Sequence, residues 1–203
     1  MSELNSAQQA IFKAAMQLFA ERGATHVNIK ELAQAAGVAR NTIYNNHVDP
    51  ETLFDDVAAN LAAEMNNRVV RSFDDVEDPA LRLAIGVRLY VRRAHEEPTW
   101  GRFLARFGFG VVSLQEIWDG QPMRDLEDGV RRGRYAIQRE QLASAVNFVA
   151  GSTLGAISLV LEGIKTWREA GSNAAEFALV GLGVARHEAR ALATQALPPL
   201  SPP

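Results

Sequence analysis

The sequence predicts an all-α protein of about nine helices, in which a small three-helix N-terminal head precedes a larger helical domain. Apolar residues recur at helical spacing along most of the chain. Helix-start signals, such as Asp-Pro and a polar cap followed by Glu or Gln, come before these runs. No segment has the alternating pattern or the Asn-Gly turn typical of a β-hairpin. We therefore expect helices alone.

The first expected helix begins near Ala7 and ends at Arg22. Ser6 and Gln9 have the spacing of a capping box, in which each side chain bonds the backbone N–H of the other residue. The apolar residues of this segment recur every three or four positions and predict one buried stripe. They are Ile11, Phe12, Ala15, Leu18 and Phe19.

The next stretch has the pattern of a helix-turn-helix. Asn28 is expected to cap a short helix, with Glu31 reaching back to it, and Gly37 ends this helix in a left-handed turn. A second short helix follows over 39–46, with Ile43 facing inward. Two short helices about a Gly turn favour a DNA-reading element. A polar, solvated helix face is the alternative interpretation.

Two Asp-Pro pairs predict the starts of the following helices, because Asp caps a helix and Pro fits its first position. Asp49-Pro50 predicts a helix that continues to about Arg71 and links two regions. Asp78-Pro79 predicts another helix, which ends before Pro98.

The remaining helices are less regular. Residues 99–120 are rich in aromatic residues and interrupted by glycines, so one or two short helices are expected there. Residues 122–132 predict a further helix. A long helix is expected over about 139–168, closed by Gly171, and a last helix from 173 to about 196.

Composition is that of a globular protein with a sizeable core. Hydrophobic residues make up 47% of the chain and charged residues 22%, with a formal net charge of −3. Cysteine is absent, which excludes a disulfide framework, Cys-zinc sites and thiol catalysis. No signal peptide is evident, and we expect a cytoplasmic location. Residues 141–161 are uncharged over the length of a membrane span, but their modest apolarity favours a buried helix, so no membrane partner is expected.

Patterns for catalysis and metal binding are missing. The four histidines lie far apart and lack partners at ligand spacing, so no metal site is expected. His47 is expected to be a packed, partly buried side chain. The sequence has no nucleophile elbow, P-loop or dinucleotide motif. We therefore expect neither enzyme activity nor a cofactor, and an enzyme on a helical scaffold is kept as an alternative.

Residues 11–53 resemble the TetR (tetracycline-repressor) family of bacterial regulators. The resemblance lies in IFKAAMQLFAERG, IKELAQAAGV, Thr42-Ile43-Tyr44 and Glu51-Thr52-Leu53, which follow the family's order and spacing. It implies a DNA-binding domain over 1–48 and a ligand-binding and dimerisation domain over 49–203. It further implies a homodimeric repressor that a small apolar or amphipathic effector, of unknown identity, releases from a palindromic double-stranded DNA operator.

The resemblance assigns DNA contacts to the outward residues of the two short helices. Arg pairs with guanine and Asn with adenine in the major groove, whereas Thr and Tyr commonly contact phosphate or a thymine methyl group. The predicted DNA-contacting residues are Asn28, Lys30, Arg40, Asn41, Thr42, Tyr44 and Asn45.

Four positions depart from the family's common pattern. Ala39 replaces a capping Ser or Thr, Asn46 and His47 replace a Tyr-Phe pair, and Pro50 replaces a phosphate-contacting Lys. Residues 1–50 are also formally neutral. These departures support an alternative function, that of a helical ligand-binding or interaction protein which derives from such a regulator and does not bind DNA.

The resemblance also implies a ligand cavity among the middle helices and a dimer interface on the last two. For each cavity residue the alternative is plain core packing, and for the small residues it is packing within one chain. The predicted cavity residues are Met65, Tyr90, Trp100, Phe103, Phe107, Trp118, Met123 and Phe148. The predicted interface residues are Gly151, Gly155, Gly181, Ala185 and Ala189.

Overall fold

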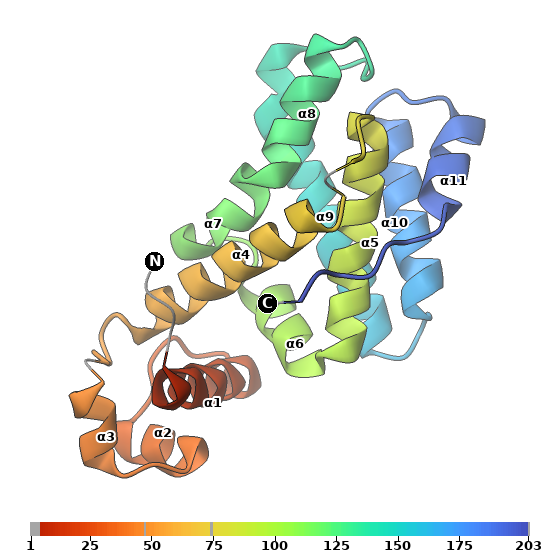
Figure 1. Cartoon of the computed structure of the whole chain (residues 1–203). Helices are drawn as coiled ribbons and strands as arrows, with labels where there is room; N and C mark the ends of the chain where they lie inside the picture. The colour runs from red at the N-terminus through yellow and green to blue at the C-terminus, as the bar shows by residue number, and fades with distance from the viewer. Residues whose placement is uncertain (1–4, 47, 74, 203) are drawn as a thin grey trace.

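The computed structural model describes residues 5–46, 48–73 and 75–202. Over these residues the chain forms eleven α-helices and one short 3-10 helix, with no strand, so the all-α prediction is confirmed. The first three helices make a small head, and the others surround the central helix α5 (Pro79–Glu96) in a larger body (Figure 1).

The head consists of α1 (Ser6–Arg22), α2 (Ile29–Ala36) and α3 (Arg40–Asn45). The expected cap of α1 is wrong by one residue, because Asn5 caps the helix and forms the capping box with Gln8. Asn5 has the extended backbone that a cap needs, whereas Ser6 is already helical.

The turn between α2 and α3 follows the prediction. Asn28 caps α2 through a bond from the Lys30 amide, and Gly37 ends it at a φ of 67°. Glu31 does not complete a capping box, because its carboxylate instead accepts a hydrogen bond from Arg22 at 2.6 Å. This ion pair joins the end of α1 to the start of α2.

Helix α4 (Leu53–Arg71) runs from the head into the body. It begins later than Asp49-Pro50 suggested. The Asp49 carboxylate accepts a bond from the Glu51 amide at 3.0 Å, so this pair forms a turn ahead of the helix rather than its first residues. The end at Arg71 is as expected.

Four helices form the first part of the body. They are α5, α6 (Pro98–Phe107), α7 (Val112–Asp119) and α8 (Gln121–Arg131). One or two short helices were expected over 99–120, and the structure has two there, α6 and α7. Asp78 caps α5 by accepting a bond from the Ala80 amide at 3.0 Å, as its position before Pro79 predicts.

The last helices differ from the prediction. A 3-10 turn (Arg139–Gln141) leads into α9 (Leu142–Leu161), and α10 (Trp167–Gly181) and α11 (Arg186–Thr194) follow. The continuous helix expected over 139–168 is wrong, because Gly163 adopts a φ of 71° after α9 and Thr166 caps α10 in a capping box with Glu169.

The helix end expected at Gly171 and the helix start expected at Asn173 are also wrong. Gly171 and Asn173 both lie inside α10. Gly171 is buried where α10 packs on α5, and a Cβ at this position would lie 3.5 Å from the Arg88 Cα, an ordinary packing distance, so the helix continues through Gly171. Gly183, at a φ of 93°, separates α10 from α11 and divides the single last helix that we expected.

Residues 139–161 satisfy the length and composition test for a membrane span, a test that the core helix of a soluble protein also passes. In this structure α9 packs against α5, α6 and α10. Eight of its residues are buried in these contacts. The helix is therefore accommodated by the core of the body.

A C-terminal strap, defined here as residues 195–202, returns across α5 to α4 (Figure 1). The Arg68 guanidinium donates to the Ser201 carbonyl at 2.7 Å, and Arg71 donates to the Pro202 carbonyl at 2.7 Å. The Ser201 amide donates to the Ser72 hydroxyl at 2.9 Å. The strap is thus bonded to the last turn of α4, the helix that connects head and body.

Candidate DNA-binding surface and ligand cavity

Helix α3 presents the polar face that the sequence predicted. Arg40, Asn41, Tyr44 and Asn45 are exposed, with 56% of Tyr44 accessible, whereas Thr42 is half-buried. Ile43 is fully buried and anchors the helix in the head. No side chain caps α3, in agreement with Ala39 at its N-cap position. The short helix must therefore be held by other contacts.

Those contacts come from Asn46, whose role the sequence did not reveal. Its side-chain oxygen accepts a bond from the Asn5 amide group at 3.0 Å, and its side-chain nitrogen donates to the Thr42 carbonyl at 2.8 Å. The Gln8 side chain donates to the Asn46 carbonyl at 3.4 Å. Asn46 therefore fixes the end of α3 to the start of α1. The neighbouring His47 lies outside the described residues.

Asn28 and Lys30 lie exposed at the start of α2, on the far side of the Gly37 turn from α3. The Asn28 side chain is engaged, because its oxygen accepts a bond from the Lys30 amide at 2.8 Å. Asn28 thus orders the N-terminus of α2, and Lys30 carries the positive charge there. A helix N-terminus with a cation nearby is suited to an anion such as a DNA phosphate.

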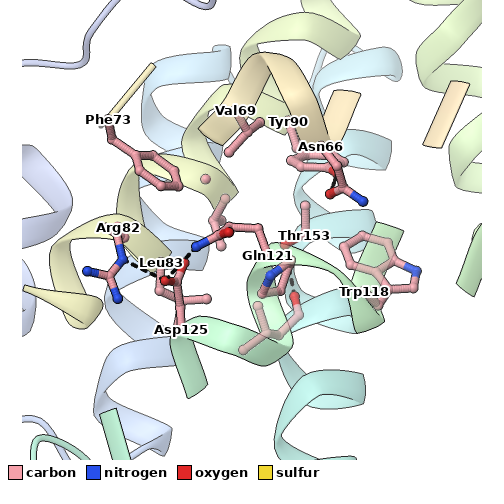
Figure 2. Close-up of a pocket in the computed structure, with 14 residues that line it drawn as sticks. Asn66, Val69, Phe73, Arg82, Leu83, Tyr90, Trp118, Gln121, Asp125 and Thr153 are labelled. Carbon is pink, nitrogen blue, oxygen red and sulfur yellow. Dashed lines mark hydrogen bonds and ion pairs between the residues drawn. The ribbon is translucent and has the colours of Figure 1, made fainter. Parts of the chain in front are cut away.

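A tight cavity of about 20 Å³ lies in the body between α4, α5, α7, α8 and α9 (Figure 2). Its walls are mainly apolar, with polar groups at two ends. This space is far below the few hundred Å³ of a typical ligand site, so a ring-sized molecule must push the walls apart. The apolar walls come from Val69, Phe73, Leu83, Val87, Tyr90, Trp118, Pro122 and Val149.

One end of the cavity holds a buried carboxylate. The Asp125 Oδ1 accepts bonds from the Arg82 Nε at 2.6 Å and from the Gln121 side chain at 2.9 Å (Figure 2). Burial raises the pKa of the Asp125 carboxyl, and the Arg82 guanidinium opposes this shift. The Asp125 Oδ2 has no hydrogen-bond partner among the described residues. This oxygen is not fully buried, since the Tyr135 hydroxyl is the only fully buried side-chain polar atom without a partner among the described residues, and Asp125 Oδ2 is therefore accessible to a hydroxyl donor.

Thr153 and Asn66 also present oxygen atoms at the cavity, whereas Arg82 and Gln121 are the donors to Asp125. The Thr153 hydroxyl donates its proton to the Val149 carbonyl at 2.8 Å, which leaves the oxygen lone pairs of Thr153 available. Asn66 donates to the Glu116 carbonyl at 2.7 Å and directs its side-chain oxygen to the Tyr90 hydroxyl at 3.4 Å. The cavity therefore favours a compact apolar ring that carries hydrogen-bond donors.

The predicted cavity residues have three different positions. Tyr90 and Trp118 line the cavity and lie 5.8 Å apart between ring centroids. Trp100 packs behind Tyr90, and Met65 is buried with its sulfur 3.4 Å from the Arg93 guanidinium. Met123 packs at the edge of the core. These last three residues support the walls without lining the space.

Phe103 and Phe107 serve the junction between head and body instead of the cavity. Phe107 lies edge-on to Phe54 of α4 with centroids 5.0 Å apart, and Phe103 lies 5.7 Å from the same ring. Phe54 in turn packs edge-on against Phe19 of α1 at 5.1 Å. An aromatic chain therefore connects α1, α4 and α6.

The expectation for Phe148 is wrong. Its ring is 45% exposed on the outside of α9, and a Cβ on Gly181 would lie 2.6 Å from it. The resemblance placed Phe148 in a cavity among the middle helices, but its side chain points away from the core. The residues that the sequence did not single out for the cavity are polar ones whose partners are distant in the chain: Asn66, Arg82, Gln121, Asp125 and Thr153.

The predicted dimer residues differ in their exposure to solvent. Gly155 and Gly181 are exposed and Gly151 half-buried on the outer face of α9 and α10, while Ala185 is exposed at the start of α11. Ala189 is fully buried within the chain, so it is unavailable to a partner and that expectation is wrong. Helical spacing alone did not reveal which side of α11 faces α10.

An apolar surface surrounds the exposed glycines. We define the α9–α10 face as Phe148, Gly151, Gly155, Phe177, Val180 and Gly181. Phe177 is 61% exposed and Val180 40% exposed, which is unusual for large apolar side chains in a monomer.

Among the described residues there is no cluster of three or more His, Cys, Asp or Glu that could hold a metal ion.

Two family profiles match the chain. Residues 11–57 match "Bacterial regulatory proteins, tetR family", and residues 78–195 match "Tetracyclin repressor-like, C-terminal domain". No curated protein sequence matches the chain.

Solved structures agree with these profiles. RolR in complex with its ligand resorcinol is 29% identical over 96% of each chain, with a TM-score of 0.73. RolR without ligand is 30% identical over 95% of this chain and 100% of RolR, with a TM-score of 0.72. The fatty acid degradation regulator FadR from Bacillus halodurans, 17% identical over 91% of this chain and 100% of its own, shares the fold at a TM-score of 0.72.

Proposed function

Because the chain belongs to the TetR family of transcriptional regulators, we propose that it is a cytoplasmic repressor which a small-molecule effector releases from its DNA operator. Regulators of this family bind DNA and are not enzymes. The proposal divides the chain into a DNA-binding domain over 1–48 and a ligand-binding and dimerisation domain over 49–203.

The DNA-binding part of the proposal rests on α3. Its exposed Arg40, Asn41, Tyr44 and Asn45 would enter a major groove, and Lys30 would contact phosphate at the start of α2. Two such heads in a homodimer would read half-sites about 34 Å apart on a palindromic operator. The exposed apolar α9–α10 face supports this dimer, since a second copy of the chain would cover it.

The effector part rests on the acceptors in the cavity. Asp125 Oδ2 and the Thr153 oxygen lie among apolar and aromatic walls, an arrangement that fits a small aromatic ring with two hydroxyl donors. RolR, which is 29% identical to this chain, binds resorcinol, a molecule of that kind. We therefore propose a phenolic effector class, more specific than the apolar or amphipathic molecule expected from the sequence.

The proposed coupling between effector and DNA rests on the position of α4, which contacts both the head and the cavity. Near its start Phe54 packs against Phe19 of the head, and further along Asn66 and Val69 line the cavity. An effector that widens the tight cavity must displace this wall and hence the head. Coupling of about 1–3 kcal/mol between effector and DNA would be sufficient for a useful switch.

DNA binding is tested by fluorescence anisotropy with the DNA upstream of the gene and with random DNA at moderate salt. We expect preferential binding to the upstream DNA, and a loss of affinity of at least about tenfold in Arg40→Ala and Tyr44→Ala. If the protein binds both DNAs equally and neither substitution has an effect, the DNA-silent alternative is supported, for which Pro50 and the neutral head are the evidence.

Effector binding is tested by calorimetry with resorcinol and with benzene as the hydroxyl-free analogue. Asp125→Asn should weaken resorcinol binding by about tenfold or more, because a bond to a charged group contributes about 1.5–3 kcal/mol. Asp119→Asn on the exposed end of α7 is the matched control. Equal binding by both variants would remove Asp125 from the effector site.

A further inference from the structure

A second hollow, distinct from the effector cavity, lies between α5, the start of α10 and the end of α11, three elements that stand side by side in Figure 1. We call it the arginine groove. It has a volume of about 630 Å³, and the first residues of the C-terminal strap form one of its walls. Its charged lining consists of Arg88, Arg92 and Arg168 against the single acid Glu96, together with His95. The groove is thus positive, although the whole chain has a formal net charge of −3.

Arg88 makes the groove unusual. It is only 8% exposed, yet no carboxylate forms an ion pair with it among the described residues. Its guanidinium makes one protein hydrogen bond, from Nη1 to the Gln195 carbonyl at 2.8 Å, and most of its five N–H donors are left without a protein acceptor. The free N–H groups of Arg88 are not among the fully buried atoms that lack a partner, so they are open to the groove although most of the side chain is buried. Burial accordingly lowers the pKa of Arg88.

Two further guanidiniums are positioned at the same groove by Trp167. The Arg168 guanidinium lies 4.3 Å from the centre of the indole ring, and that of Arg92 lies 5.5 Å from it. Glu96 accepts a bond from Arg92 Nε at 2.8 Å and so offsets only one of the three positive charges. Arg168 forms no ion pair among the described residues. Cation–π contacts of this kind hold arginines in place while their N–H groups stay available.

We propose that the arginine groove binds a small ligand through a carboxylate or phosphate group, with Arg88 as the buried contact and Arg168 at the rim. The planar fork of an arginine matches both oxyanions, and hydrogen bonds between charged partners are stronger than those between neutral ones. The alternative role for Arg88 is purely structural, because Gln195 is the C-cap of α11 and a cation there satisfies the end of the helix.

The groove is also linked to α4 through the C-terminal strap. Gln195 belongs to the strap, whose later residues Ser201 and Pro202 are bonded to Arg68 and Arg71 of α4. An anion in the groove would therefore contact the same segment that holds the end of α4. This consequence rests on the proposed function, but anion binding itself does not.

The experiment is calorimetry on the full chain with inorganic phosphate and with benzoate, against sodium chloride of equal ionic strength. We expect saturable binding of at least one oxyanion, weakened at least about tenfold by Arg88→Met and about threefold by Arg168→Gln. Arg186→Met is the matched control, because its side chain is 84% exposed outside the groove, and it should bind as the wild type does. Asp125→Asn should also leave anion binding unchanged, which separates this site from the effector cavity.

The preferred probe identifies the ligand chemistry: tighter phosphate indicates a phosphorylated molecule and tighter benzoate an organic acid. The proposal is overturned if neither probe binds saturably, or if Arg88→Met binds as the wild type does. It is also overturned if Arg88→Met lowers only the melting temperature and leaves anion affinity intact, since Arg88 would then be only a structural tie. Should Arg88→Met fail to fold, the double variant Arg92→Gln with Arg168→Gln tests the accessible rim of the groove instead. Weaker anion binding by this variant supports the proposal, and unchanged binding overturns it.

Discussion

The guanidinium of Arg106 donates from Nη1 to the backbone carbonyl of Ala20 at 3.0 Å and approaches the Glu21 carbonyl at 3.4 Å. Arg106 lies on α6 of the body, and the two carbonyls belong to the last turn of α1 in the head. A Cβ at position 23 would lie 2.8 Å from this guanidinium, so Gly23 leaves the space that it occupies. Head and body are thus joined by a polar contact in addition to the aromatic chain through Phe54.

Replacing Arg106 with Gln should loosen this junction. The terminal carbonyls of α1 would lose their donor, at a cost of about 1 kcal/mol in the free energy of unfolding. We expect a smaller effector-induced loss of DNA affinity, measured by anisotropy with and without effector. Arg102→Gln, an exposed change on the same helix, is the control. An unchanged effector response in Arg106→Gln would show that the aromatic chain alone transmits the signal.

Asn46→Ala should release the end of α3 from α1. The substitution removes the bonds with Asn5 and with the Thr42 carbonyl, so amide hydrogens of α3 should exchange about tenfold faster or more. Hydrogen exchange with mass spectrometry over residues 40–46 measures this effect. Gln115→Ala, on the exposed side of α7, should leave these amides unchanged. Equal exchange in both variants would contradict the role assigned to Asn46.

Phe177→Glu should separate the proposed dimer into monomers. A charge in the centre of an apolar interface costs several kcal/mol when it has no partner, which corresponds to a loss of dimer affinity of about a hundredfold or more. Sedimentation equilibrium gives the molar mass directly. Val112→Glu, at a residue that is 78% exposed on α7, is the matched control. A wild-type protein that is monomeric at all concentrations would refute the dimer.

Asp78→Asn should reduce stability near neutral pH and have less effect in acid. Burial alone would raise the pKa of the Asp78 carboxyl, but hydrogen bonds from Arg134 and the Ala80 amide outweigh it and leave this pKa below its ordinary value. A lowered folded-state pKa contributes stability above the unfolded pKa of about 3.9, and this contribution is lost as the pH falls further.

The expected difference between wild type and Asp78→Asn is about 1 kcal/mol or less at pH 7, because the ion pair with Arg134 is partly exposed. Urea unfolding at a series of pH values measures it. Asn keeps the capping oxygen, so the change isolates the charge. A difference that grows towards low pH would have the wrong sign and would contradict this interpretation.

Local chemistry allowed most helices to be predicted. Asn28, Gly37 and Asp78 act within a few residues of themselves, and their roles follow from backbone preferences. Gly171 misled for the same reason. A glycine suggests a helix end, but Gly171 lies buried inside α10 where this helix packs on α5, and that packing depends on the tertiary fold.

The two candidate sites also differ in how far the sequence could predict them. The exposed residues of α3 follow from the spacing about a single buried Ile43, so this surface was accessible to sequence reasoning. The polar end of the cavity was not, because Arg82 and Asp125 are 43 positions apart and become partners only when α5 and α8 pack together. Aromatic residues drew the prediction to Phe103 and Phe107, whose positions in the core give no sign of whether a space lies beside them.

The C-terminal strap imposes an order on protein synthesis. Arg68 and its partner Ser201 are 133 positions apart, so α4 leaves the ribosome long before the segment that holds its last turn exists. At about 5–20 residues per second, this delay amounts to about 7–27 seconds. During this interval a nascent chain would carry a folded head on a helix without its final anchor. Communication between the body and the head would therefore be the last property that each newly made molecule acquires.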